Sequence, residues 1–146
     1  SNLDKLIGDM IDGAQRSYTK ISTGAVQATA TLTSTGAAVA AETALVANVT
    51  LTAKASGAIA ANGEFNVSAT VATQAANIAA AINAVPALSG KVTATSSLGV
   101  VTITAVQPGV SGNGLQLSES LTNVTAVAFA SGSDGSQVAI NYGAAS

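Results

Sequence analysis

The chain has 146 residues and a net charge of −2, and although 48% of its residues are hydrophobic, only 8% are charged and 3% aromatic. Its five basic residues are spread along the chain and form no stripe, so we expect no nucleic-acid partner. It has no histidine and no cysteine, which excludes the commonest catalytic bases and nucleophiles and the usual zinc ligands.

The acidic residues do not indicate a site either. Asp4, Asp9 and Asp12 lie near the N-terminus, and the other carboxylates stand alone in the sequence, at Glu42, Glu64, Glu119 and Asp134. We therefore expect no enzyme activity, no catalytic residue, no cofactor, no metal ion and no small-molecule substrate. Because no run of about 18 apolar residues is uninterrupted, we also expect no membrane partner.

Small side chains dominate the apolar content, and they favour an assembly over a free monomer. Buried apolar area contributes about 25 cal/mol per Å², so a core made largely of Ala and Val stabilises a monomer weakly. A typical domain has about a quarter of its residues charged, and a surface with far fewer charges is poorly protected against association. Both difficulties disappear if neighbouring subunits cover much of the surface.

Residues 1–24 differ from the rest of the chain and are predicted to form an N-terminal amphipathic arm. Half of the chain's charged residues lie within residues 1–20. Five large apolar residues recur there at the spacing of one helix face. The helix either packs on its own domain or docks on a neighbouring subunit. We expect the second, with a subunit interface formed by Leu3, Leu6, Ile7, Met10 and Ile11.

Residues 25–146 are predicted to form a single β-rich domain, because the apolar period changes to two. The Asn62-Gly63 pair predicts a tight hairpin turn, and Ser97-Leu98-Gly99 predicts another. Residues 34–43 are an Ala-rich connection of undefined form. Strands are predicted at residues 26–33, 49–54, 65–71, 92–96, 100–106, 115–117, 124–129 and 138–142.

One segment of this domain follows the helical period instead. Residues 74–84 place Ile78 and Ile82 on one face, with Thr73 as the cap and Pro86 after the end. We expect both isoleucines to be buried against a sheet, and Phe65 and Phe129 to be core residues. The predicted fold is mainly β: an antiparallel sandwich or barrel of about seven or eight short strands with this helix packed across it, plus the N-terminal helical arm.

Residues 44–136 carry a resemblance to a known class of proteins. The stretch FNVSATVATQAANIAAAINA (65–84) precedes KVTAT (91–95) and GVVTITA (99–105), and these are followed by PGVSGNG (108–114), LQL (115–117) and ASGSDG (130–135). This order resembles a module of tailed-bacteriophage structural proteins, including the contractile tail-sheath proteins of Mu-like phages.

The resemblance implies a non-enzymatic, self-assembling structural subunit of a bacteriophage virion. Its partners would be copies of itself and other virion proteins, and its location would be the virion, assembled in the host cytoplasm. The chain is too short for a complete sheath protein, so a tail-tube or similar tail component is the first expectation. A capsid decoration (cement) protein and a bacterial surface filament or adhesin module are the alternatives. A carbohydrate-binding module is less favoured, because the chain has no Trp and only two Tyr for stacking on sugars.

Overall fold

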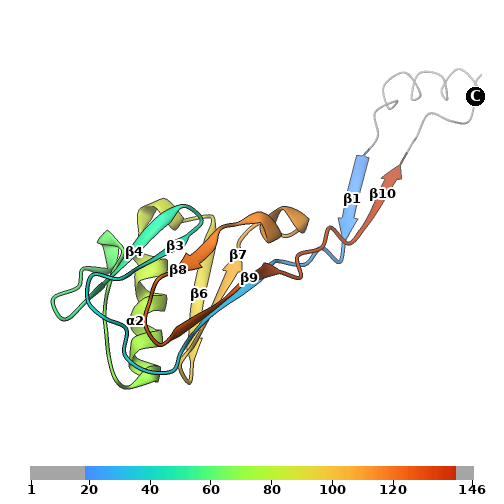
Figure 1. Ribbon diagram of the computed structural model, residues 1–146. Helices are drawn as coiled ribbons and strands as arrows, with labels where there is room; N and C mark the ends of the chain where they lie inside the picture. Colours follow the sequence, from blue (N-terminus) through green and yellow to red (C-terminus); the bar gives the residue numbers. More distant parts are fainter. Residues whose placement is uncertain (1–18, 141–146) are drawn as a thin grey trace, which may run out of the picture. The chain divides into compact units, whose positions relative to one another are not determined.

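The structure, a computed structural model, describes residues 19–140 (Figure 1). The described residues belong to two compact units, which are considered one at a time. The first is the body, Val26–Ser133. The second contains a two-stranded ladder of β1 (Thr19–Thr23) and β10 (Ser136–Ile140). The predicted arm helix and its interface residues Leu3, Leu6, Ile7, Met10 and Ile11 lie outside the described residues.

The first sheet of the body has four antiparallel strands in the order β6-β7-β2-β9. They are β2 (Thr29–Ser34), β6 (Val92–Ser97), β7 (Val100–Ala105) and β9 (Val124–Ala130). The predicted hairpin at Ser97-Leu98-Gly99 is confirmed, because β6 and β7 pair up to Ser97 and Val100. Leu98 and Gly99 have φ values of 49° and 88°, which is the backbone of a type I′ turn.

The second sheet has the order β5-β4-β3-β8. Its strands are β3 (Thr43–Val46), β4 (Val49–Lys54), β5 (Glu64–Asn66) and β8 (Leu117–Glu119). The sequence analysis did not predict β3, because its first residue lies in the connection of undefined form, residues 34–43, and the rest follows directly after it. A two-residue turn with positive φ at Ala47 and Asn48 joins β3 to β4. Alanine is an uncommon residue for such a turn, so the sequence carried no turn signal there.

The hairpin predicted at Asn62-Gly63 is wrong, because β4 and β5 run parallel. The chain crosses over between them and ends in a short 3-10 helix, η1 (Ala60–Asn62). Gly63 then takes a left-handed conformation, with φ 75°. A Cβ atom at this position would lie 2.9 Å from the carbonyl oxygen of Thr50. The Asn-Gly pair therefore ends a helical turn and does not join two neighbouring antiparallel strands.

The strand predicted at 65–71 is shorter in the structure, and the predicted helix is longer. Strand β5 ends at Asn66, and α2 spans Val71–Ala84 and not 74–84. The strand period and the helix period both fit Val71. It continues the every-second-residue alternation that starts at Phe65, but it also stands seven residues before Ile78, and residues seven apart lie on the same face of a helix. Thr70, and not Thr73, occupies the N-cap position.

A bulge in β9 explains why residues 124–129 alternate poorly. Thr31 pairs with Val127, but Thr29 pairs with Ala130, so two residues of β9 stand opposite the single residue Ala30. The extra residue shifts the alternation by one position. As a result Val124 and Phe129, which have opposite parity in the sequence, are both buried.

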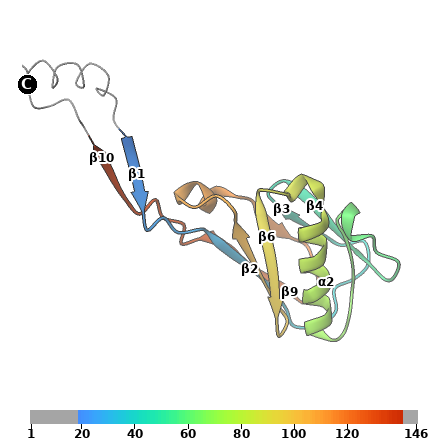
Figure 2. The ribbon, with the colours of Figure 1, turned by 180° about the vertical axis from the view of Figure 1, so that it is seen from behind.

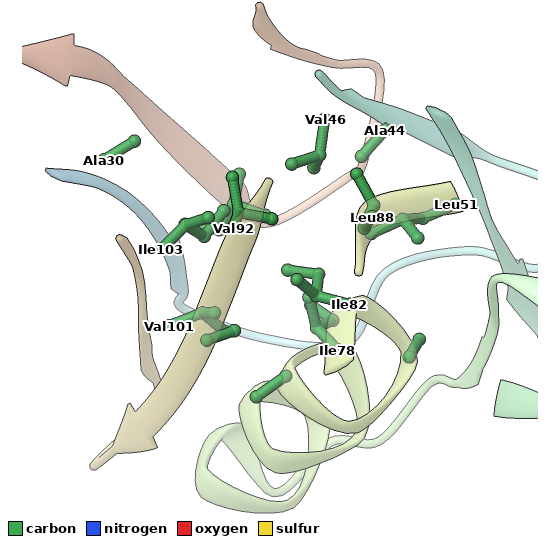
Figure 3. Packing of buried hydrophobic residues seen from close by; sticks show 14 of the residues in the cluster. Ala30, Ala44, Val46, Leu51, Ile78, Ile82, Leu88, Val92, Val101 and Ile103 are labelled. Carbon is green, nitrogen blue, oxygen red and sulfur yellow. The ribbon is translucent and has the colours of Figure 1, made fainter. Parts of the chain in front are cut away.

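Helix α2 packs against β2, β6 and β7 of the first sheet and against β5 of the second (Figure 2). Ile78 and Ile82 are 0% and 1% exposed, and they lie among side chains of both sheets (Figure 3). The burial predicted for these isoleucines and for Phe65 and Phe129 is therefore confirmed.

The described fold is mainly β, with eight strands in two sheets and one α-helix in the body. The prediction of this fold class is confirmed at that level. The body is not a closed barrel, because β8 and β9 contact each other without belonging to one sheet and α2 contacts the far edge strands β5 and β6. The predicted last strand pairs with β1 and not with either sheet of the body.

Candidate assembly interface

The chain enters and leaves the body at one place, which we call the neck: Val26, Gly109, Asn113, Gly132 and Ser133. The amide of Val26 donates to the carbonyl of Ser133 at 2.8 Å, and the amide of Ser133 donates back to the carbonyl of Val26 at 3.1 Å. The same carbonyl accepts from the amide of Gly109 at 3.0 Å. These bonds hold the two chain ends side by side.

Asn113 reinforces the neck from the loop that contains η3 (Val110–Gly114). Its side-chain Nδ2 donates to the carbonyl of Gly132 at 3.1 Å, and its Oδ1 accepts from the amide of Gly132 at 2.8 Å. A Cβ atom on Gly132 would lie 2.4 Å from the carbonyl oxygen of Gly109, so only glycine fits without a backbone shift. The glycine-rich loop that contains Asn113 thus has a definite structural role.

In the second unit, strands β1 and β10 form an antiparallel ladder, which we call the ribbon. Its register pairs Thr23 with Ser136, Ile21 with Val138 and Thr19 with Ile140. The ribbon is a sheet of its own, in which each strand has one paired edge and one edge outside the ladder. A two-stranded sheet is marginally stable by itself in water, and a free strand edge is a template for pairing with another chain.

Val26 of the neck is one of three exposed valines in the segments that hydrogen bonds join there. Val26, Val106 and Val110 are 47%, 38% and 53% exposed. Val26 accepts the Gly109 amide described above, and the side chain of Gln27 donates to the carbonyl of Val106 at 3.0 Å, which ties these segments together. We call Val26, Val106 and Val110, together with the hollow beside them, the neck surface.

The hollow has a volume of about 290 Å³ and lies between the start of β6 and the loop after β7. Its lining is mostly small or apolar: Gly90, Lys91, Ala105, Gln107, Ser111, Gly112 and Leu115. Lys91 is its one charged lining residue. Within residues 19–140, no carboxylate lies in ion-pair contact with Lys91.

The described residues contain no candidate metal site and no candidate membrane-spanning helix. Between residues 19 and 140 there is no cluster of three or more carboxylates that could hold a metal ion. A larger hollow of about 350 Å³ beside β4 has Lys54 as its one charged lining residue. Over the same part of the chain, no helix has the length and apolar character needed to cross a bilayer.

Glu42 is an acidic side chain with a clear structural role. One carboxylate oxygen accepts from the amides of Val39 and Thr122, each at 2.8 Å, and the other accepts from the Thr122 hydroxyl at 2.7 Å. These bonds, the Thr122 hydroxyl first, hold the pKa of Glu42 below its ordinary value of 4.5. The carboxylate ties the connection before β3 to the turn before β9, and its oxygens are already used.

Sequence reasoning missed Gln74, which the structure buries completely. Its Oε1 accepts from the amides of Ala38 and Ser68, and its Nε2 donates to the Ser34 hydroxyl and the Gly36 carbonyl, all within 2.9–3.1 Å. A signal was present in the sequence. Gln74 stands four residues before Ile78 and eight before Ile82, so it lies on the buried face of α2.

No protein-family model and no curated protein matches the sequence.

Proposed function

We propose that this chain is a non-enzymatic structural subunit of a self-assembling particle, most specifically a tail component of a bacteriophage virion. The observation that carries the proposal is the ribbon, a two-stranded sheet that includes no strand of the body. Such a ribbon gains stability when a further strand or surface is added to it, and a neighbouring subunit supplies one.

The body supports the same proposal. Its charged residues are few, so little long-range repulsion opposes close packing of copies. Its two sheets and helix enclose one core built largely from Ala, Val, Leu and Ile, which gives a rigid block for repeated contacts. We include in the proposal that the two sheets form an open sandwich, with α2 closing the side where β5 and β6 lie.

The resemblance of residues 44–136 to a module of tailed-phage structural proteins directs the proposal to a virion, with copies of the chain and other virion proteins as partners. A tail component fits best because a ribbon can connect neighbouring subunits in a ring or between rings. In this proposal the chain has no substrate, cofactor or nucleic-acid partner.

The test is the association state of the purified full chain over a range of concentrations and salt, followed by negative-stain electron microscopy. We expect oligomers that appear as rings or stacked rings. Compact trimers or similar small clusters that bind an empty capsid would favour a decoration protein. A monomer at every concentration, with a ribbon protected from hydrogen exchange, would overturn the assembly proposal, because the ribbon would then be stabilised within one chain.

A further inference from the structure

The neck surface concentrates exposed apolar side chains at one end of the body. Among residues 24–135, seven large hydrophobic side chains are exposed, and three of them are Val26, Val106 and Val110. The others lie in four separate segments of the body: Val39, Ile59, Leu98 and Val127. Single exposed apolar residues are normal on a protein surface, but a group of them beside a hollow indicates a binding surface.

The hollow beside the valines adds shape and charge. Ala105, Gly112 and Leu115 line it, so it can accept apolar side chains. Lys91 adds a positive charge that no described carboxylate neutralises. A matching partner would carry a stripe of large apolar residues with acidic residues beside it. This is the helix-in-groove mode of recognition, in which apolar anchors enter a groove and charges set the orientation.

Residues 1–12 have this composition. Five of them are large apolar residues at helix spacing, and in a helix Asp4 and Asp9 stand at the two edges of that stripe. We propose that the neck surface binds residues 1–12 of a second copy of this chain, with the stripe Leu3, Leu6, Ile7, Met10 and Ile11 facing Val26, Val106, Val110 and the hollow. The inference rests on the proposed function, and it names the surface that receives the arm.

A second copy is the occupant because the resulting contact repeats. Each subunit then donates one arm and receives one, so the two contacting surfaces are different and the interface is head-to-tail. Such interfaces generate closed rings or open stacks, which is what a tail component requires. The arm also precedes β1 directly, so the same subunit contact can include the ribbon.

The chain has no cysteine, which allows a direct crosslinking test. Two full-length variants, Ile7→Cys and Val106→Cys, carry different affinity tags and are mixed under assembly conditions and then mildly oxidised. We expect disulfide-linked dimers that contain one chain of each kind. The matched control replaces Val106→Cys with Val127→Cys, at an exposed valine on β9. It should give no mixed dimer above background.

Two outcomes would overturn the proposal. One is mixed dimers that form equally well with Val127→Cys. The other is a disulfide that forms only inside an Ile7→Cys/Val106→Cys double variant, at a rate independent of concentration, because the arm would then bind its own neck surface. If the chain assembles but no Ile7–Val106 disulfide forms, docking of the arm at the neck surface is contradicted while the proposed function stands. If the chain never associates, both the docking and the proposed function are contradicted.

Reversing charges on the neck surface and on the arm tests the same contact through the association of the chain, without introducing cysteine. Lys91→Glu should weaken association at low salt, and the loss should shrink as salt screens the charges. Combining it with Asp9→Lys should restore at least part of the association. Lys54→Gln and Lys91→Gln form the control pair: both remove one positive charge, but Lys54 lies beside the other hollow, in an ion pair with Glu64 at 3.8 Å, and should leave association unchanged. Equal losses for Lys91→Gln and Lys54→Gln would contradict docking at the neck.

Discussion

At the scale of single residues, hydrogen bonding explains more of this body than charge does. Within residues 24–135, all buried side-chain nitrogen and oxygen atoms have a hydrogen-bond partner. Gln74 shows how this is achieved in a core of small residues. Its amide group satisfies backbone atoms of the connection after β2 and of the segment before α2, which otherwise have no strand partner.

Replacing Gln74 tests this role. Gln74→Met keeps a similar volume but leaves the amides of Ala38 and Ser68 and the carbonyl of Gly36 without their partner. An unsatisfied buried polar group costs about 1–3 kcal/mol, so we expect a loss of at least about 2 kcal/mol in the free energy of unfolding. Urea denaturation followed by circular dichroism measures it. Gln116→Met, at an exposed glutamine, is the control and should change stability by less than about 0.5 kcal/mol.

Glu42 predicts how stability depends on pH. Its pKa in the folded chain lies below 4.5, so its ionised form is favoured by folding. The stabilisation is therefore complete above the unfolded value and is lost as the pH falls through the lowered folded value. We expect Glu42→Gln to lower the melting temperature at neutral pH, and the difference from the natural chain to shrink in acid.

Thr122→Val is the matched variant for Glu42, because the Thr122 hydroxyl is the largest cause of the lowered pKa. Like Glu42→Gln, it should make the melting temperature depend less on pH in acid. It should also lower the melting temperature less in the Glu42→Gln background than it does in the natural chain. Additive effects of the two substitutions would mean that the pair acts independently and would contradict this account.

At the scale of elements, the sequence predicted those whose periods are unambiguous. The strands around Leu32, Leu51 and Ile103 and the helix around Ile78 were all found, because their buried residues keep a constant spacing. The errors have local physical causes. Val71 fits both periods, a bulge hides the alternation of β9, and the Asn62-Gly63 pair has the same local conformational preference in a hairpin and at a helix end.

The pairing of β4 with β5 shows a limit of another kind. Whether two successive strands run parallel or antiparallel depends on the path between them, and residues 55–63 carry no strong periodic signal. Glu64 and Asn66 fix that path by accepting hydrogen bonds from the amides of Ile59 and Ala58. These contacts join residues that are five to eight positions apart in a loop, and no apolar pattern in the sequence predicts them.

The packing of helix α2 predicts how much stability one of its buried isoleucines contributes. Ile82 is 1% exposed and lies on the face of α2 that meets both sheets. Ile82→Ala removes apolar contacts and leaves a cavity, so we expect a loss of about 2–5 kcal/mol in the free energy of unfolding. The matched control is Ala80→Gly or Ala80→Ser on the exposed face, which reports helix propensity alone. A loss below about 0.5 kcal/mol for Ile82→Ala, measured by denaturation of unassembled subunit, would contradict the packing.

At the scale of the whole molecule, the core and the proposed arm occupy different parts of the chain. Every residue of the buried apolar cluster lies between Ala28 and Phe129, within the body. The arm residues were predicted from spacing alone, and they lie outside the described part. The neck surface could not be predicted, because the hydrogen bonds from Gly109 to Val26 and from Gln27 to Val106 join residues that are far apart in the sequence.

This separation predicts the effect of removing the arm. Deleting residues 1–18 leaves β1, the neck and the whole described core in the chain, so folding should be retained and the melting temperature of the body should change little. Assembly should be lost, because the apolar stripe and its acidic residues are the proposed contact with a neighbouring copy. Differential scanning calorimetry measures the first effect, and analytical ultracentrifugation measures the second.

A finer variant separates the stripe from the length of the arm. Leu6→Asp with Met10→Asp keeps all residues but places two charges on the apolar stripe, and it should abolish assembly as the deletion does. Lys5→Gln with Arg16→Gln changes the charge of the same segment away from the stripe and should weaken assembly only slightly. Normal assembly of the deleted chain would remove the arm from the interface. A large fall in its melting temperature would instead mean that the arm covers its own subunit, since a contact made only between subunits stabilises the assembly and not the isolated fold.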